Sequence, residues 1–394
     1  MKQNYRSLTF SINYTISCIA LIIAGLLQSC AKEQFPLYPP EPGSGVKENH
    51  DWSGLADSLQ DVLYQTYRSP DGRYFMQNNT GNQTFHYWWN AHAMDVLADA
   101  HERTGAESYK TRMQALLSGI KNKNGNSLVN NFYDDMEWLA LSSLRAFGST
   151  QDPVFKDAAV LLWNDIKTGE NTTMGGGIAW NKNQLYYKNT PANAPAIILA
   201  ARLYQLDKKQ EDLDAAVRLY TWLKQTLLDP VSGLAWDGIN SKNDEAIDKN
   251  LFTYNQGTFV GAALELYNAT QNAAYLNDAV RTAKAAISNT SITPSGILKS
   301  EGQGDGGLFK GILVRYFTRL ALNTAVADAD KATIIAFLKA NAVSIYQKGM
   351  ARPGLLINSD WTARPPGSID LSTQLSGMMM IEAAALLKKN SVIE

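Results

Sequence analysis

The amino-acid sequence predicts an all-α fold, an (α/α)6 barrel in which six helical hairpins close into a toroid. Three observations predict it. Apolar residues recur at helical spacing along almost the whole chain beyond residue 50. The periodic stretches divide into twelve helices, and a turn segment of one kind follows every odd-numbered helix. These six units, roughly 50–65 residues apart, indicate an internal repeat.

The helices follow one another with ordinary start signals. The fifth begins at Asp152-Pro153, a helix cap followed by proline at the first helical position. The eighth begins at Thr253, which together with Gln256 has the spacing of a capping box. Alanine-rich stretches such as 196–201 have high helix propensity. The twelve predicted helices cover approximately 52–67, 86–104, 106–121, 132–147, 153–168, 191–206, 210–228, 253–269, 273–289, 306–322, 329–348 and 371–388.

Each odd-numbered helix is followed by a glycine or asparagine turn and a short apolar segment. The six segments are Gly72–Phe75, Asn126–Val129, Gly177–Trp180, Gly233–Trp236, Gly296–Lys299 and Gly354–Ile357. The even helices are more apolar and richer in small residues, as an inner ring packed on two sides requires. We therefore expect even helices inside and odd helices outside, with an open solenoid as the alternative. In the closed arrangement every odd-to-even connection lies on one face.

The N-terminus carries the features of an exported lipoprotein. Residues 1–30 combine early positive charge with a short apolar run, as secretory signals do. They end in Leu27-Gln28-Ser29-Cys30, which resembles a lipobox with Cys30 as the lipidated residue; a plain signal peptide is the alternative. Residues 31–49 are predicted to be a flexible tether and 50–394 a single domain. We expect a membrane attachment through this lipid anchor, on the periplasmic face or surface of a Gram-negative cell envelope.

Composition excludes several classes of function. The formal net charge is −1 and no basic stripe is present, so nucleic acid is excluded as a partner. His86, His92 and His101 do not have metal-ligand spacing, and no Gly-x-Ser-x-Gly elbow is present. We expect a monomer. The nine Trp and eighteen Tyr are many for this length, and aromatics near loop ends often form platforms for sugar rings.

The odd-to-even connections hold most of the unusual residues, whereas the opposite connections are short and plain. Binding residues gather on loops held by a rigid scaffold, so this face is the expected site. The candidate binding residues are Trp88, Trp89, Asn90, Tyr133, Trp180, Asn189, Asn193, Trp236, Tyr254, Asn255, Gln256, Asp305 and Trp361. For each tryptophan, burial in the core is the alternative, and Gln256 has its capping role as an alternative.

The tandem aspartates Asp134 and Asp135 are the candidate catalytic residues. Glycoside cleavage needs one protonated and one ionised carboxyl group, and repulsion between neighbours in a partly dry cleft raises one pKa. Aspartates at a helix start more often serve as caps or interact with the helix dipole. Because Phe132, Tyr133 and Trp138 flank the pair on the predicted functional face, catalysis is the favoured interpretation.

Several motifs together resemble glycoside hydrolase family 76, the endo-α-1,6-mannanases. They are Tyr133–Met136, Gly175–Trp180, Lys188–Asn193, Thr253–Gly257, Gly304–Gly311 and Ser372–Gln374. The resemblance covers nearly the whole domain. It implies an (α/α)6 barrel, α-mannan as the polysaccharide substrate, and retaining hydrolysis without a metal or organic cofactor. By the same resemblance, Asp134 matches the nucleophile and Asp135 the acid/base. The alternatives are action on another α-linked glycan and a non-catalytic glycan-binding lipoprotein.

Overall fold

The twelve predicted helices are all present in the computed structural model, which describes residues 50–393. Their bounds are α2 (Trp52–Val62), α3 (Tyr87–Thr104), α4 (Glu107–Lys123), α5 (Tyr133–Thr150), α6 (Pro153–Ile166), α7 (Thr190–Asp207), α8 (Gln210–Leu227), α9 (Thr253–Thr270), α10 (Ala273–Ser288), α11 (Gly306–Leu322), α12 (Asp328–Ser344) and α13 (Leu371–Lys389). Single turns of other helix types are η1 (Leu63–Tyr67), η2 (Lys167–Gly169), η3 (Thr173–Gly175), η4 (Pro294–Gly296) and η5 (Ile345–Gly349). No helix within 50–393 combines the length and apolar character that crossing a bilayer requires. The predicted signal 1–30, with Cys30, and the predicted tether 31–49 lie outside the described residues.

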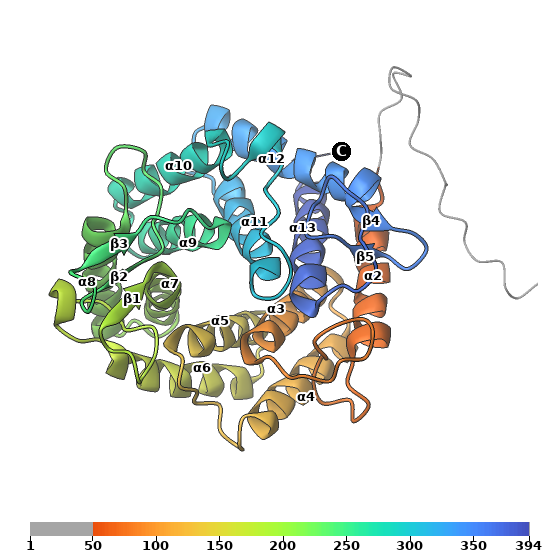
Figure 1. Ribbon diagram of the computed structural model, residues 1–394, viewed down its shortest axis with the longest axis horizontal. Helices are drawn as coiled ribbons and strands as arrows, with labels where there is room; N and C mark the ends of the chain where they lie inside the picture. Colours follow the sequence, from red (N-terminus) through yellow and green to blue (C-terminus); the bar gives the residue numbers. More distant parts are fainter. Residues whose placement is uncertain (1–49, 394) are drawn as a thin grey trace, which may run out of the picture. The chain divides into compact units, whose positions relative to one another are not determined.

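The helices of residues 50–393 form an inner ring and an outer ring (Figure 1). In the inner ring, α3, α5, α7, α9, α11 and α13 each pack against the next, and α13 packs against α3. Each inner helix also packs against the outer helix that follows it, while α13 packs against α2 from the start of the domain. These last contacts close the ring, so the predicted (α/α)6 barrel is confirmed and the open solenoid is wrong.

Burial separates the two rings as their composition predicts. In α7, every residue from 190 to 201 is buried, because both neighbours and the outer ring cover it. In the outer helix α8, burial follows one stripe that includes Ala215, Leu219 and Leu223. Small residues let inner helices approach closely. A Cβ on Gly257 would lie 2.4 Å from the Leu313 Cα on the adjacent helix.

A side-chain amide at the fourth position of an inner helix holds the preceding turn segment in place. Asn90 accepts a hydrogen bond from the Phe75 N–H at 2.8 Å and donates one to the Phe75 carbonyl at 3.1 Å. Equivalent two-way pairs join Asn193 to Ile178 and Gln256 to Ala235. The repeat seen in the sequence is therefore a repeated clamp between a turn segment and the helix after it.

This clamp corrects two expectations. The capping box at the start of α9 is wrong: the cap position is Phe252, and the Thr253 hydroxyl donates to Glu301. Asn90, Asn193 and Gln256 were expected to bind substrate. All three are fully buried, and their amides are hydrogen-bonded to backbone groups. They therefore hold the turn segments in place and are not exposed to a substrate.

A small antiparallel sheet at the rim of the ring was not predicted. It joins β1 (Tyr187–Asn189), β2 (Gly238–Asn240) and β3 (Ala246–Asp248), with Lys188 opposite Ile239 and Ile239 opposite Ile247. A second pair joins β4 (Met350–Ala351) and β5 (Leu356–Ile357). Because β1 leads directly into α7 and β2 follows Asp237, the first sheet places two connections side by side at the predicted face.

Candidate active site

A cleft of about 660 Å³ lies at the end of the ring where the inner helices begin. It is lined by Phe85, His86, Tyr87, Trp88, Phe132, Asp134, Asp135, Trp138, Trp180, Tyr187, Asn189, Asp237, Tyr254, Asp305 and Phe309. These residues come from the first turns of inner helices and from the odd-to-even connections just before them. The cleft therefore lies on the face that the sequence predicts.

The tandem aspartates occupy the first turn of α5. The cap position is Phe132, and no side chain caps this helix, so neither aspartate has the capping role that was the alternative. The Trp180 indole donates to Asp134 Oδ2 at 3.0 Å, and the Asp135 backbone N–H donates to Asp134 Oδ1 at 3.0 Å. Asp135 Oδ2 accepts from the Asn130 amide at 2.8 Å. Donors therefore reach both oxygens of Asp134 but only one of Asp135.

Burial dominates the electrostatics of the pair. It raises the pKa of Asp134 to about 7, against the donors on its two oxygens. Burial, then the charges of Asp134 and Asp305, raise the pKa of Asp135 well above its ordinary value. Among the described residues, no lysine or arginine lines the cleft to offset these effects. The pair therefore holds a proton near neutral pH, with Asp135 as its favoured carrier.

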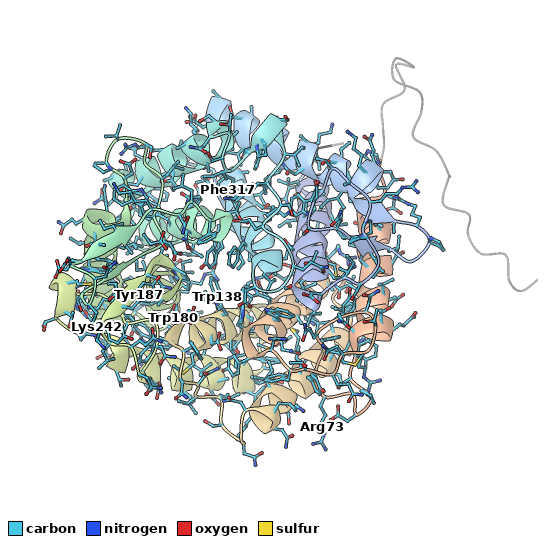
Figure 2. All side chains as sticks on the ribbon, viewed as in Figure 1. Arg73, Trp138, Trp180, Tyr187, Lys242 and Phe317 are labelled. Carbon is cyan, nitrogen blue, oxygen red and sulfur yellow. The ribbon has the colours of Figure 1, made fainter. Side chains whose placement is uncertain are left out.

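Aromatic rings cover much of the cleft wall. Tyr254 and Phe309 stack face to face, with centroids 3.8 Å apart and planes 3° apart. Trp180 packs edge-on against Phe132 at 5.1 Å. In Figure 2, Trp138 lies near the middle of the ring, with Trp180 and Tyr187 toward one side of it. Flat apolar rings beside carboxylates suit a ligand with both C–H faces and hydroxyl groups, such as a sugar chain.

Two polar networks fix the other carboxylates of the cleft. Asp305 Oδ1 accepts from the indoles of both Trp88 and Trp89, each at 2.9 Å. Asp237 accepts from the Asn255 amide at 2.9 Å and from the Tyr187 hydroxyl at 3.2 Å. Both carboxylates are thus held by neutral donors, which fix their direction.

The structure brings about half of the predicted residues together in the cleft. Those lining it are Trp88, Asp134, Asp135, Trp180, Asn189, Tyr254 and Asp305. Trp89, Tyr133 and Asn255 are buried and do not line the cleft. Trp236 lies outside the lining, with the Lys249 ammonium 4.7 Å from its ring centroid. Trp361 is 0% exposed and packs against the Lys310 ammonium at 4.4 Å, so its expected role as a sugar platform is wrong.

Sequence reasoning missed several lining residues that stand beside predicted ones. Tyr187 lies two residues before Asn189, and Asp237 directly follows Trp236. Trp138 lies one helical turn after Asp134, so helical spacing from the aspartates could have selected it. Phe309 likewise lies one helical turn after Asp305, although its place beside Tyr254 depends on packing between α9 and α11.

Comparison with known proteins decides the family. The model of glycosyl hydrolase family 76 matches residues 54–394. The chain belongs to this family. The α-1,6-mannanase GH76A of Salegentibacter sp. HEL1_6 is 47% identical, with a TM-score of 0.84 over 86% of this chain and 100% of that one. A Listeria innocua protein is 38% identical, with a TM-score of 0.80 over 86% of this chain and 99% of that one.

Curated relatives in the family are more distant. The mannan endo-1,6-α-mannosidase DCW1 of Eremothecium gossypii is 25% identical over 222 residues, which is 53% of this chain and 45% of the relative. The DCW1 mannosidase of Candida glabrata is 27% identical over 47% of this chain and 46% of the relative. The chain thus spans about half the length of these curated relatives. The resemblance to family 76 is nevertheless confirmed across almost the whole domain.

Proposed function

We propose that the protein is a retaining endo-hydrolase of α-1,6-mannosidic linkages in an α-mannan, with Asp134 and Asp135 as its catalytic pair. The observation that carries the proposal is the pair itself: two adjacent carboxyls with raised pKa values in an aromatic cleft without cations. A variant of the Salegentibacter α-1,6-mannanase with two consecutive aspartates replaced by asparagines is described as inactive and was solved with α-1,6-mannotriose. That description supports the same use of the pair here.

The hydrogen bonds support a division of labour within the pair. Asp134 receives donors on both oxygens, which favour its ionised form and suit a nucleophile. Asp135 has one oxygen free of donors from the described residues, and burial and the charge of Asp134 raise its pKa well above the ordinary value, which suits a proton donor. Asp135 protonates the glycosidic oxygen while Asp134 attacks the anomeric carbon. Asp135 then takes a proton from the water that releases the glycosyl group from Asp134.

The experiment is digestion of unbranched α-1,6-mannan by the purified protein. Wild type is expected to release short mannooligosaccharides of several lengths, with the anomeric configuration retained in the first product. Asp134→Asn and Asp135→Asn are each expected to lower the rate by about 10²–10⁴-fold or more, since each removes a group acting on the reacting atoms. Asp328→Asn, at a fully exposed position on α12, is the matched control and keeps full activity.

Three results would contradict the proposal. Mannan binding without turnover would identify a glycan-capturing protein instead. Release from another α-linked glycan in a polysaccharide panel, with none from mannan, would replace the substrate. Undiminished activity of Asp134→Asn would remove the pair from catalysis.

We also propose that the protein acts as a monomer attached to the cell envelope by a lipid on Cys30. The support is Leu27–Cys30, which resembles a lipobox. Cells grown with labelled palmitate are expected to label the wild type and not Cys30→Ala. Equal labelling, or release of both proteins into the medium, would contradict the anchor, and light scattering of the purified protein checks the monomer.

A further inference from the structure

Asp305 stands at the start of α11, yet it does not cap that helix. Its backbone is already helical, with φ −63° and ψ −40°, and no cap hydrogen bond is made. The side chain instead reaches α3, where Oδ1 accepts both indole N–H groups of Trp88 and Trp89 at 2.9 Å. Its other oxygen takes no hydrogen bond from the described residues. The Asp305 carboxylate therefore lines the cleft and does not cap α11.

The backbone around Asp305 is held tightly from two sides. The Gly304 N–H donates to Asp370 Oδ2 at 2.9 Å, and the Asp370 N–H donates to Gln303 Oε1 at 2.7 Å. On the other side, a Cβ on Gly306 would lie 2.1 Å from the Glu301 carbonyl oxygen, a distance that excludes any side chain there. The glycines of this loop allow the close approach, and the contacts with the start of α13 fix where Asp305 stands.

The charge of Asp305 acts on both tandem aspartates. It is among the causes that raise the pKa of Asp134 and that of Asp135. Other titratable groups also face the pair or line the same cleft: Glu137 on α5, His86 and Tyr87 at the start of α3, Tyr187 on β1, Asp237 before β2 and Tyr254 on α9. None of these is a lysine or arginine. Among the carboxylates of the other inner helices and connections, only Asp305 acts on both members of the pair.

We propose that Asp305 is a third carboxylate of the reaction, a positioning residue that the Trp88 and Trp89 indoles hold in the same cleft as the tandem pair, where it acts on the acid of the pair and on the bound sugar. The inference rests on the proposed function of the pair. Two indole donors fix the direction of the Asp305 carboxylate and with it the position of its charge. The same charge favours the positive charge that develops on the sugar ring during glycoside cleavage. Its role is electrostatic, since Asp135 carries the proton.

Direct titration of the pair tests this role without requiring activity. Protein labelled with ¹³C at the aspartate carboxyls is titrated by NMR, with the pair's resonances assigned through Asp134→Asn and Asp135→Asn. In Asp305→Asn both midpoints are expected to fall, by roughly 0.5–1 pH unit for loss of one charge across a partly solvated cleft. Asp305→Glu retains the charge and is expected to keep both midpoints close to wild type. Midpoints that do not move in Asp305→Asn would overturn the proposal.

The pH profile of mannan hydrolysis gives the second readout. Both limbs of the kcat/KM profile are expected to move to lower pH in Asp305→Asn, and to return in Asp305→Glu. A lower rate with an unmoved profile would show a merely structural role and would overturn the inference. If wild type does not cleave mannan, the proposed function fails, yet the NMR titration still decides the role of Asp305.

Discussion

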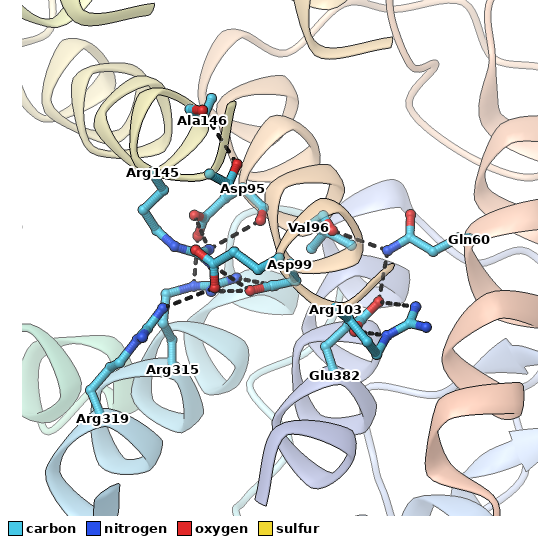
Figure 3. A network of polar contacts seen from close by, with 12 residues as sticks. Gln60, Asp95, Val96, Asp99, Arg103, Arg145, Ala146, Arg315, Arg319 and Glu382 are labelled. Carbon is cyan, nitrogen blue, oxygen red and sulfur yellow. Dashed lines mark hydrogen bonds and ion pairs between the residues drawn. The ribbon is translucent and has the colours of Figure 1, made fainter. Parts of the chain in front are cut away.

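The two ends of the inner ring treat buried carboxylates in opposite ways. At the cleft end, Asp134 and Asp135 have raised pKa values and no cation beside them. At the far end, burial also acts on Asp95 and Asp99, but the charges of Arg145 and Arg315 outweigh it and lower both pKa values. Figure 3 shows this network. Arg145 Nη1 lies 2.5 Å from Asp95 Oδ1, and Arg315 Nη2 lies 2.8 Å from Asp99 Oδ2.

The difference shows that counter-charge, rather than burial, sets the direction of the pKa shift at each end. Helix α3 contributes to both: Trp88 lines the cleft, and Asp95 and Asp99 lie two and three turns further along. At the far end each acid neutralises an arginine, which makes a cross-brace between α3, α5 and α11. At the cleft end the acids remain uncompensated. That arrangement opposes folding, and in the proposed reaction it supplies the proton of the acid.

The largest expected change in stability comes from removing an arginine of the cross-brace. Arg145 is 7% exposed and pairs with Asp95, Asp99 and Glu102. Arg145→Ala leaves Asp95 and Asp99 with Arg315 alone to balance two buried charges, and it is expected to lower the free energy of unfolding by about 3–5 kcal/mol. Denaturant unfolding measures it. The matched control is Arg319→Ala, whose side chain is 40% exposed and makes one 3.3 Å pair, with an expected loss of about 0–1 kcal/mol. Equal losses would contradict the contrast between buried and peripheral pairs.

A smaller effect of opposite sign is expected at the cleft. The folded protein binds protons on the pair more tightly than the unfolded chain does, so this stabilisation is complete below about pH 4 and is lost as the pH rises toward 7. The double variant Asp134→Asn, Asp135→Asn has no carboxyl to ionise at this place, so its stability does not fall in the same pH range. Its free energy of unfolding should exceed that of wild type by about 1–2 kcal/mol at pH 7, after allowance for solvent screening, with no gain at pH 4.

The matched variant at the other end of the ring is expected to change the free energy of unfolding in the opposite direction. Asp95→Asn removes a charge that Arg145 and Arg315 stabilise, so it should destabilise the protein at pH 7. Thermal melts of both variants between pH 4 and 8 make the comparison. A double cleft variant that is less stable than wild type at pH 7 would show that the tandem charges contribute to folding instead of opposing it.

Helical periodicity predicted the barrel because each inner helix is apolar on most of its surface and each outer helix on one stripe. It also placed Asp134 and Asp135 on the correct face, since the repeat fixes which connections share an end. Periodicity does not show whether a polar residue at a helix start faces the cleft or the preceding turn. Asn90 and Asn193 were therefore expected to bind substrate, whereas their amides clamp backbone groups.

The arginine network was not predicted, because its partners are distant in the chain. Arg145 and Asp95 are 50 positions apart, and Arg315 and Asp99 are 216 apart. Closure of the ring brings the Arg315 side chain of α11 within reach of these acids on α3. The prediction for Trp361 was wrong for a related reason. Its connection holds many aromatic and polar residues, which suggested exposure, but the Trp361 ring is buried against Lys310.

The smallest expected effect concerns a third carboxyl on α5. Glu137 is 0% exposed, and neither carboxyl oxygen has a hydrogen-bond partner among the described residues. Burial, and then the charge of Asp134, raise its pKa well above the ordinary range. Like the tandem pair it lacks a cation, but unlike the pair it is closed off from the cleft. It is therefore expected to be a neutral acid at neutral pH, since ionising it there would leave an unpaired buried charge.

Glu137→Gln separates that state from an ionised one. The glutamine keeps the shape and neutrality of the protonated acid but takes up no proton on folding, so its free energy of unfolding should exceed that of wild type by about 1 kcal/mol at pH 8. The gain should disappear near pH 4, where the glutamate is protonated in both states. Mannan hydrolysis should be nearly unchanged, because no charge next to Asp134 is altered. A stability loss in Glu137→Gln that grows with pH would show that the glutamate is ionised, and the cleft end would then contain one more negative charge than this comparison assigns to it.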